Sequence, residues 1–222
     1  FTRPTARLAE TLANVRRLLA GERIRLADGT EGLRLNHIPT QPVPIWVAGL
    51  GPQTSALARQ HADGWFPALL PAAELRAGFG DDPGDGGAAE LVIGPIGAVF
   101  GDADVARDVV CQLVGWYLTG MGRMYGDRLA AAGFHREVAQ LRLANPSPRP
   151  GRIVWPHEVD VVLDEVAVHG DADVAAARLE RWDSLADIVS VVAPPMIGDA
   201  VLDLVEAAAP RIAATVNDRS DR

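Results

Sequence analysis

Apolar residues follow two different spacings along this chain, and the two spacings alternate. Residues 5–21 place leucine and valine three or four positions apart, which is the pattern of a helix with one buried face. Other runs are short and almost continuously apolar, as in strands that are buried on both faces. These runs lie at 45–48, 65–69, 91–100 and 187–193. Helices and buried strands are therefore expected to alternate along the chain.

Helical spacing fills the segments between and after these runs. The predicted helices lie at 52–62, 71–79, 104–119, 123–143, 156–166, 171–182 and 198–214. Residues 166–170 form only a short return segment before the helix at 171–182. The alternation predicts an α/β protein whose parallel sheet is covered by helices. Four strands are half of a (β/α)₈ barrel, and a doubly wound open sheet is the alternative.

Turn-forming residues divide this pattern further. Asp28-Gly29, between two short apolar runs, predicts a small hairpin over 24–35. Gly133 predicts a kink or a break in the helix that surrounds it. Three prolines indicate a linker at 145–151, and residues 80–87, rich in glycine and aspartate, are expected to be the most flexible stretch.

The candidate binding site lies where the first predicted strand turns into a helix. Gly49 and Gly51 follow that strand, and we expect both to let the backbone turn with positive φ. Pro52 suits the first helical position, where a missing N–H costs nothing. Unpaired N–H groups and the helix dipole attract phosphate at such a helix start, and the Thr54 hydroxyl adds a candidate donor. The candidate phosphate-binding residues are Ala48, Gly49, Leu50, Gly51 and Pro52.

The glycine pattern by itself is not specific for a ligand. It is not the dinucleotide fingerprint, because Thr54 stands where the third glycine would be. Many turns between a strand and a helix carry two glycines and bind nothing. Plain strand-to-helix architecture therefore stays open as an alternative.

Composition narrows the class of protein. The formal net charge is −8, which argues against non-specific binding to nucleic acid or to an anionic membrane. No apolar run reaches the roughly 18 residues of a transmembrane helix. Residues 1–4 lead straight into the first predicted helix without a signal peptide, so we expect a cytoplasmic protein. All 21 basic residues are arginines, which excludes Schiff-base chemistry and a P-loop lysine.

Other candidate chemistry is sparse. The histidines have no pair at helical ligand spacing, so no metal site is expected. Cys111 is the only cysteine, which excludes an internal disulfide, and it lies in an apolar helix where core packing is expected. No Gly-x-Ser-x-Gly elbow is present, which argues against the common hydrolases. Asp63 is interpreted as a turn residue between a helix and a strand, not as a catalytic acid.

Aromatic residues and methionines gather around the break between two predicted helices. They are Trp116, Tyr117, Met121, Met124 and Tyr125. Core packing is the plain interpretation, and a substrate lid or a dimer contact is the functional one, because these residue types are enriched at interfaces.

Five stretches occur in an order and spacing that match one enzyme superfamily. They are Leu18-Leu19-Ala20-Gly21-Glu22, residues 42–52, Ala62-Asp63-Gly64, residues 117–122 with Gly133-Phe134, and residues 166–170 with 188–195. Together they resemble the luciferase-like monooxygenase superfamily. The most similar branch is that of the actinobacterial oxidoreductases that use the 8-hydroxy-5-deazaflavin coenzyme F420.

The resemblance implies a (β/α)₈ TIM barrel, of which this chain holds about the C-terminal half and a helical insertion. A single luciferase-like domain is expected over 1–216, with a polar tail at 217–222. In the family, backbone groups after the fifth strand contact the phosphate-bearing tail of the cofactor, and Ala48 to Pro52 match that position. Most catalytic side chains of the family come from the first barrel half, so the resemblance assigns no catalytic residue here.

The implied activity is hydride transfer between coenzyme F420 and a small organic substrate, in an enzyme expected to be a homodimer. An FMN-dependent monooxygenase of the same superfamily is an alternative, because both cofactors present a phosphate in a similar place. A non-catalytic, truncated barrel subunit is the third hypothesis, since the first barrel half is not visible in the sequence.

Overall fold

A computed structural model of the protein describes residues 3–25, 28–79, 89–194 and 205. The loop predicted at 80–87, the tail at 217–222 and, apart from Val205, the helix predicted at 198–214 lie outside these residues. The chain divides into two compact units. The first unit contains residues 1–66 and 78–91, and the second contains residues 67–77 and 92–222.

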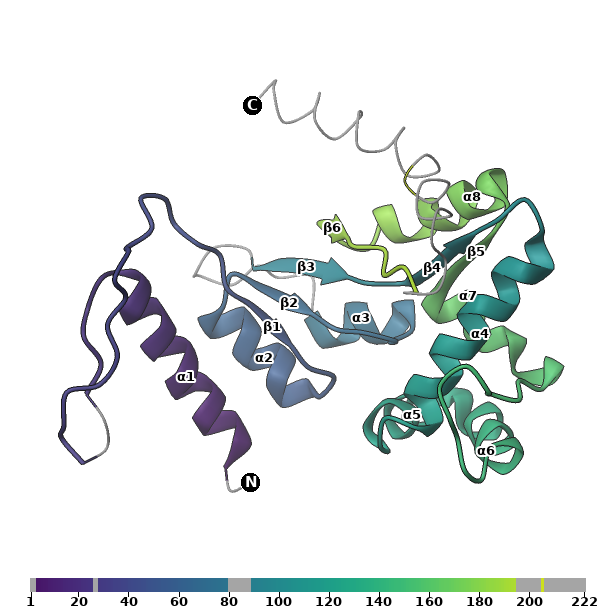
Figure 1. The fold of residues 1–222 in the computed structure, drawn as a ribbon, viewed down its shortest axis with the longest axis horizontal. Coiled ribbons are helices and arrows are strands. Elements are labelled where there is room, and N and C mark those ends of the chain that lie inside the picture. Colours follow the sequence, from purple (N-terminus) through teal and green to yellow (C-terminus); the bar gives the residue numbers. More distant parts are fainter. Residues whose placement is uncertain (1–2, 26–27, 80–88, 195–204, 206–222) are drawn as a thin grey trace. The chain divides into compact units, whose positions relative to one another are not determined.

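In the first unit, helices pack beside short parallel strands. Its elements are α1 (Pro4–Leu19), β1 (Trp46–Ala48), α2 (Pro52–His61), β2 (Gly64–Phe66) and the first half of β3 (Glu90–Ile93). β1 pairs in parallel with β2, and β2 pairs in parallel with β3 (Figure 1). In this register Val47 lies opposite Trp65, and Trp65 lies opposite Leu91. All three side chains are buried, so together they form the core on one face of these strands.

The hairpin predicted between α1 and β1 is present. Arg25 and Glu31 form an antiparallel bridge, and the Ile24 N–H donates to the carbonyl of Leu33 at 3.0 Å. Gly29 has a φ of 82°, which is the left-handed conformation that favours glycine at the turn. Gly21, with a φ of 84°, ends α1 in the same conformation.

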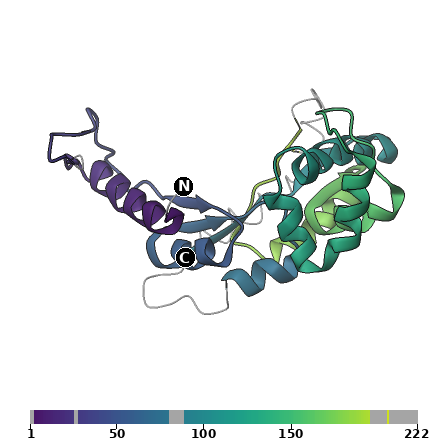
Figure 2. The same cartoon turned by 90° about the horizontal axis from the view of Figure 1, so that it is seen from below.

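The second unit is larger and mostly helical. Its elements are the start of α3 (Ala72–Phe79), the end of β3, β4 (Ile96–Val99), α4 (Ala103–Thr119), α5 (Met124–Leu129), η1 (Ala130–Phe134), α6 (His135–Ala144), η2 (His157–Val159), α7 (Asp160–Val166), β5 (Ala167–Gly170), α8 (Ala172–Asp183) and β6 (Ile188–Val189). β4 pairs in parallel with β5, and the end of β3 pairs in parallel with β6. α4 lies along β4 and β5, and α8 packs against β5 (Figures 1 and 2).

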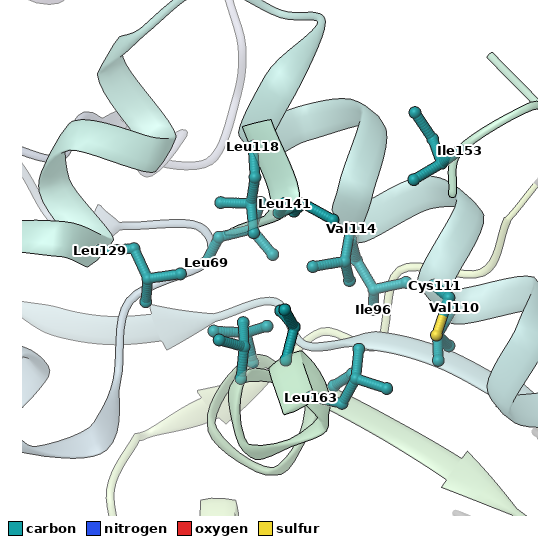
Figure 3. Packing of buried hydrophobic residues seen from close by; sticks show 14 of the residues in the cluster. Leu69, Ile96, Val110, Cys111, Val114, Leu118, Leu129, Leu141, Ile153 and Leu163 are labelled. Carbon is teal, nitrogen blue, oxygen red and sulfur yellow. The ribbon is translucent and has the colours of Figure 1, made fainter. Parts of the chain in front are cut away.

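One apolar core holds this unit together. Its side chains come from β4, α4, α6 and α7, and several of them point toward one another in Figure 3. Cys111 is buried among them at 1% exposure, which confirms its predicted packing role. Asp102 and Asp171 cap the helices that follow them, because their carboxylates accept N–H groups of the first turn of α4 and of α8.

The predicted pattern of strands needs three corrections. The run at 91–100 is two strands, β3 and β4, separated at Gly94-Pro95. The segment at 166–170 contains a strand, β5, so the described residues hold six strands and not four. The run at 187–193 is a strand only over Ile188–Val189, whereas the strand in the run at 65–69 ends at Phe66, directly before Pro67. Every pairing between these strands is parallel, as predicted.

The predicted break near Gly133 is confirmed. The helical residues after α4 divide into α5, a π-helical turn and α6, and Gly133 has a φ of 110° inside that turn. A side chain with a Cβ resists this conformation, so the glycine explains where the helix changes direction. Among the helices of the described ranges, none is both long enough and apolar enough to pass through a lipid bilayer.

Candidate functional site

The turn between β1 and α2, residues 48–52, has the open form expected of a backbone binding site. Gly51 is the N-cap of α2, with φ of −91° and ψ of 153°, and Pro52 is the first helical residue. A Cβ built on Gly51 would meet no atom within 4 Å. The space directly above this residue is therefore available to a ligand.

The expectation of positive φ at Gly49 and Gly51 was wrong. Gly51 is extended, and Gly49 is not among the residues with positive φ. Gly49 is required for a different reason, because a Cβ there would lie 2.4 Å from the Thr54 Cγ2 atom. The close approach of the Thr54 side chain, and not the backbone conformation, excludes a larger residue at position 49.

The hydrogen bonds in this turn involve mainly its carbonyl groups. The N–H groups of Thr54 and Ser55 donate to the Gly51 carbonyl at 3.0 and 3.1 Å. The Trp65 Nε1 atom donates to the Gly49 carbonyl at 2.9 Å. The Ser55 hydroxyl donates to the Pro52 carbonyl at 3.0 Å. The carbonyls of Gly49, Gly51 and Pro52, which would repel an anion, are thus already engaged.

The donors at the helix start are fewer than the sequence predicted, but some remain. Pro52 has no N–H, and the Thr54 N–H is already donated. Helix geometry then leaves the Gln53 N–H without an intrahelical acceptor. Within the part of the chain that the structure describes, the Thr54 hydroxyl makes no hydrogen bond. α2 has no acidic residue in its first turn, so no carboxylate there opposes an anion.

Asp63 holds the framework of this turn. One of its carboxylate oxygens accepts the Ile45 N–H at 2.7 Å, and the other lies 3.1 Å from the Arg16 guanidinium. Its own N–H donates to the Ile45 carbonyl at 2.9 Å, and its carbonyl accepts the Glu90 N–H at 2.8 Å. This residue therefore links α1, the start of β1 and the start of β3. Its interpretation as a structural turn residue is consistent with these bonds.

The glycine of the Ala62-Asp63-Gly64 motif makes room for a tryptophan. Gly64 lies opposite Trp46 in the register of β1 and β2. A Cβ on Gly64 would lie 2.6 Å from the Trp46 ring and 2.8 Å from the Glu90 carbonyl. The Trp46 ring can lie over β2 only because this position has no side chain.

The aromatic and methionine cluster separates into two groups. Trp116, Tyr117 and Tyr125 pack against the core of the second unit, and the two tyrosine rings meet edge to face at 5.1 Å. Met121 and Met124 are exposed. The core interpretation therefore describes the aromatic residues, and a lid or dimer contact remains a prediction for the methionines alone.

A charged cluster that the sequence did not reveal joins α4 to α7. Arg107 donates to both carboxylate oxygens of Asp160, at 3.1 and 2.6 Å. Trp155 Nε1 and His157 Nδ1 approach the same carboxylate at 2.9 and 2.8 Å. Burial raises the pKa of Asp160, but the hydrogen bonds from Arg107 and Trp155 outweigh it, so the pKa is lowered overall. Such an ion pair has a structural explanation, since it ties the starts of two helices.

Two buried titratable groups complete the electrostatics of the second unit. Burial raises the pKa of the Cys111 thiol to about 12, which keeps the thiol protonated and unreactive. Burial and the charge of Arg178 lower the pKa of His169 to about 4, so this histidine is neutral near pH 7. Across residues 3–25, 28–79 and 89–194, no group of three or more metal-binding side chains is brought together.

A short part of this chain is similar to a curated protein. One curated relative is an F420-dependent hydroxymycolic acid dehydrogenase of Mycobacterium tuberculosis (strain ATCC 25618 / H37Rv). It is 41% identical over 63 residues, which are 27% of this chain and 18% of the relative.

Solved structures extend the likeness to most of the fold. The coenzyme F420 dependent tetrahydromethanopterin reductase of Methanopyrus kandleri superposes with a TM-score of 0.65, at 13% identity over 92% of this chain and 61% of that one. EDTA monooxygenase of Chelativorans sp. BNC1 gives a TM-score of 0.53, at 18% identity over 97% of this chain and 61% of that one. The chain thus spans about 61% of the length of these two proteins.

The family itself is shown by the sequence. The profile described as luciferase-like monooxygenase matches residues 1–187, which is most of the chain. The parallel α/β architecture and the likeness to the solved structures agree with the predicted barrel type. The chain belongs to the luciferase-like monooxygenase family.

Proposed function

We propose that this chain binds coenzyme F420 and takes part in hydride transfer between the coenzyme and a small organic substrate. The observation that carries the proposal is the 41% identity to an F420-dependent dehydrogenase. The fold also resembles that of an F420-dependent reductase, which is consistent with binding of this coenzyme. Chemistry would come from the coenzyme ring, and the protein would bind and orient it.

The turn at 48–52 is the proposed site for the phosphate of the coenzyme. Trp65, Thr54 and Ser55 engage the carbonyls of Gly49, Gly51 and Pro52, whereas the Gln53 N–H and the Thr54 hydroxyl remain as donors among the described residues. Donors without competing acceptors select an anion, and the dipole of α2 adds to this preference. Nothing in this turn is a proton donor of suitable acidity for catalysis, so its proposed role is binding only.

Fluorescence titration with F420 and with FMN, in parallel, tests the choice of coenzyme. We expect F420 to bind in the micromolar range and FMN to bind more weakly. Tighter binding of FMN would move the assignment to an FMN-dependent monooxygenase, which the likeness to EDTA monooxygenase supports. Rapid reaction of the reduced cofactor with oxygen would support the same alternative. Absence of binding by either cofactor would favour a non-catalytic barrel subunit.

A pair of glycine variants tests the phosphate turn. Gly51→Val places a branched side chain in the open space above the turn, and we expect the dissociation constant for F420 to rise by about tenfold or more. Gly101→Val is the control, because a Cβ at Gly101 also meets no atom within 4 Å and the residue precedes a different helix, α4. Unchanged affinity in Gly51→Val would contradict the assignment of this turn.

The proposed oligomer is a homodimer. The exposed side chains of Met121 and Met124 are the proposed contact, since methionine is enriched at interfaces and both lie in the helical insertion. Sedimentation of the protein and of the Met121→Glu/Met124→Glu variant tests this. A dimer that persists in the variant would place the interface elsewhere.

A further inference from the structure

Trp65 is the buried residue that reaches the proposed phosphate turn from the neighbouring strand. Its side chain is 1% exposed, so the polar N–H of its indole ring must find an acceptor inside the protein. That acceptor is the carbonyl of Gly49, at 2.9 Å. Trp65 lies opposite Val47 in the strand register, and Gly49 is two residues beyond Val47. The indole therefore spans from β2 to the first residues after β1.

This hydrogen bond fixes the backbone at the point where the turn begins. A peptide group is planar, so holding the Gly49 carbonyl also holds the plane of the peptide that leads into Leu50. On the other side, the Thr54 side chain packs so closely against Gly49 that no Cβ fits between them. Gly49 is thus held by Trp65 and confined by Thr54, and this sets the path of the chain into Gly51.

We infer that Trp65 is a positioning residue for the phosphate turn, acting through the Gly49 carbonyl without touching the coenzyme. The inference rests on the proposed function, because it assigns Trp65 a role in binding the phosphate. A purely structural tryptophan would affect every ligand of the protein alike. A positioning tryptophan affects only ligands that carry the phosphate, since the turn is the part of the site that it holds.

The test compares two ligands on the full chain and on Trp65→Phe. One ligand is F420, and the other is its 8-hydroxy-5-deazaflavin without the phosphate-bearing tail. We expect Trp65→Phe to raise the dissociation constant for F420 by about tenfold, because it removes the hydrogen bond to the turn. The dissociation constant for the ligand without phosphate should stay within about twofold.

Two further variants separate positioning from loss of fold. Trp182→Phe removes another buried tryptophan, 3% exposed and located on α8, and should leave both dissociation constants unchanged. Replacing Trp65 by β-(3-benzothienyl)alanine keeps the bicyclic shape and puts sulfur, which cannot donate a hydrogen bond, in place of the N–H, so it should reproduce the effect of Trp65→Phe on F420 binding with little change in packing. Equal weakening of both ligands, or no weakening of either, in the benzothienyl variant would overturn the positioning role.

The unmodified protein distinguishes this failure from failure of the proposed function. If it binds F420 no better than the ligand without phosphate, then the turn binds no phosphate and both proposals fail. If it prefers F420 and the Trp65 variants keep the full preference, then the phosphate turn stands and only the role of Trp65 is overturned.

Discussion

Side chains form hydrogen bonds with the backbone in two short segments, residues 153–154 and the turn at 48–52. The two segments differ in which backbone groups are bonded. In the segment 153–154, the Gln112 side-chain amide accepts the Ile153 N–H at 2.8 Å and donates to the Ile153 carbonyl at 3.0 Å. The Asn145 side-chain amide accepts the Val154 N–H and donates to the Val154 carbonyl, each at 2.8 Å. In the β1–α2 turn, by contrast, side chains and helix N–H groups engage the carbonyls of Gly49, Gly51 and Pro52. Within the described part of the chain, the Gln53 N–H and the Thr54 hydroxyl remain as donors.

The difference separates a closed segment from an open one. Two side-chain amides replace the neighbouring strand that residues 153–154 lack, and they leave no backbone group for a ligand. In the turn at 48–52, three carbonyls are engaged and donors remain beside them, which favours binding of an anion. The backbone groups that already have hydrogen-bond partners therefore distinguish the scaffold segment from the candidate site, even though both segments contain few charged residues.

Asn145→Ala gives the largest expected effect, and it should act on the closed segment alone. The variant removes three hydrogen bonds of the buried Asn145 side chain, two to the backbone of Val154 and one to the Leu141 carbonyl. At about 0.5–1.5 kcal/mol for each hydrogen bond, the loss of these three bonds should lower the unfolding free energy by about 2–4 kcal/mol. Urea denaturation measures the loss, and Gln140→Ala, an exposed amide on the same helix, is the control. A loss no larger than that of the control would show that the segment is not held by Asn145.

Gly115→Ala should give the next largest effect. A Cβ at this position of α4 would lie 2.4 Å from the Ile153 Cγ2 atom, so the closed segment would have to move. Overpacking of this kind costs about 1–3 kcal/mol. A double-mutant cycle with Ile153→Ala checks the cause, because the penalty should shrink when the Cγ2 atom is removed. An undiminished penalty would place the strain elsewhere in α4.

The sequence predicted what local spacing determines. Helical periodicity located α1, α2, α4 and α8, and Gly133 marked the break in the insertion. The order of motifs pointed to the family that residues 1–187 match. The helices and the break depend on neighbours within about one helical turn, which sequence patterns record directly.

Contacts between distant positions could not be predicted in this way. Asn145 was interpreted as part of a linker, because no local spacing reveals its bonds to Val154. The bond from the Ile153 N–H to Gln112, 41 residues away in the chain, was missed for the same reason. The reason for Gly49 was also missed, since it depends on where the Thr54 side chain packs in three dimensions. β5 was too short to stand out, although pairing with β4 makes it a strand.

Acid should weaken the unit that holds the closed segment. The pKa of His169 is lowered to about 4 from 6.5, so the unfolded chain takes up a proton that the folded state refuses. The contribution of the neutral His169 to the unfolding free energy is therefore complete above pH 6.5, and it is lost as the pH falls from 6.5 toward 4. The loss should be about 1–2 kcal/mol after screening by solvent. Urea denaturation between pH 7 and 4 measures it, and His169→Gln should flatten the profile. An equal decline in the variant would assign the acid sensitivity to other groups.

The smallest change in unfolding free energy is expected for a substitution at Gly51, in the turn at 48–52. Gly51→Ala places its Cβ in open space at an extended backbone conformation that alanine adopts readily. A lower chain entropy of the unfolded state favours alanine, whereas the N-cap position favours glycine, so unfolding free energy should change by less than about 0.5 kcal/mol. Gly49→Ala meets Thr54 at 2.4 Å and should lose about 1–3 kcal/mol. Thermal denaturation of both variants measures these changes. Because only the methyl group at position 51 projects into the proposed phosphate site, weaker F420 binding with unchanged stability in Gly51→Ala would separate binding from folding within one turn. Equal destabilisation by the two substitutions would mean that the turn is closed like the segment 153–154.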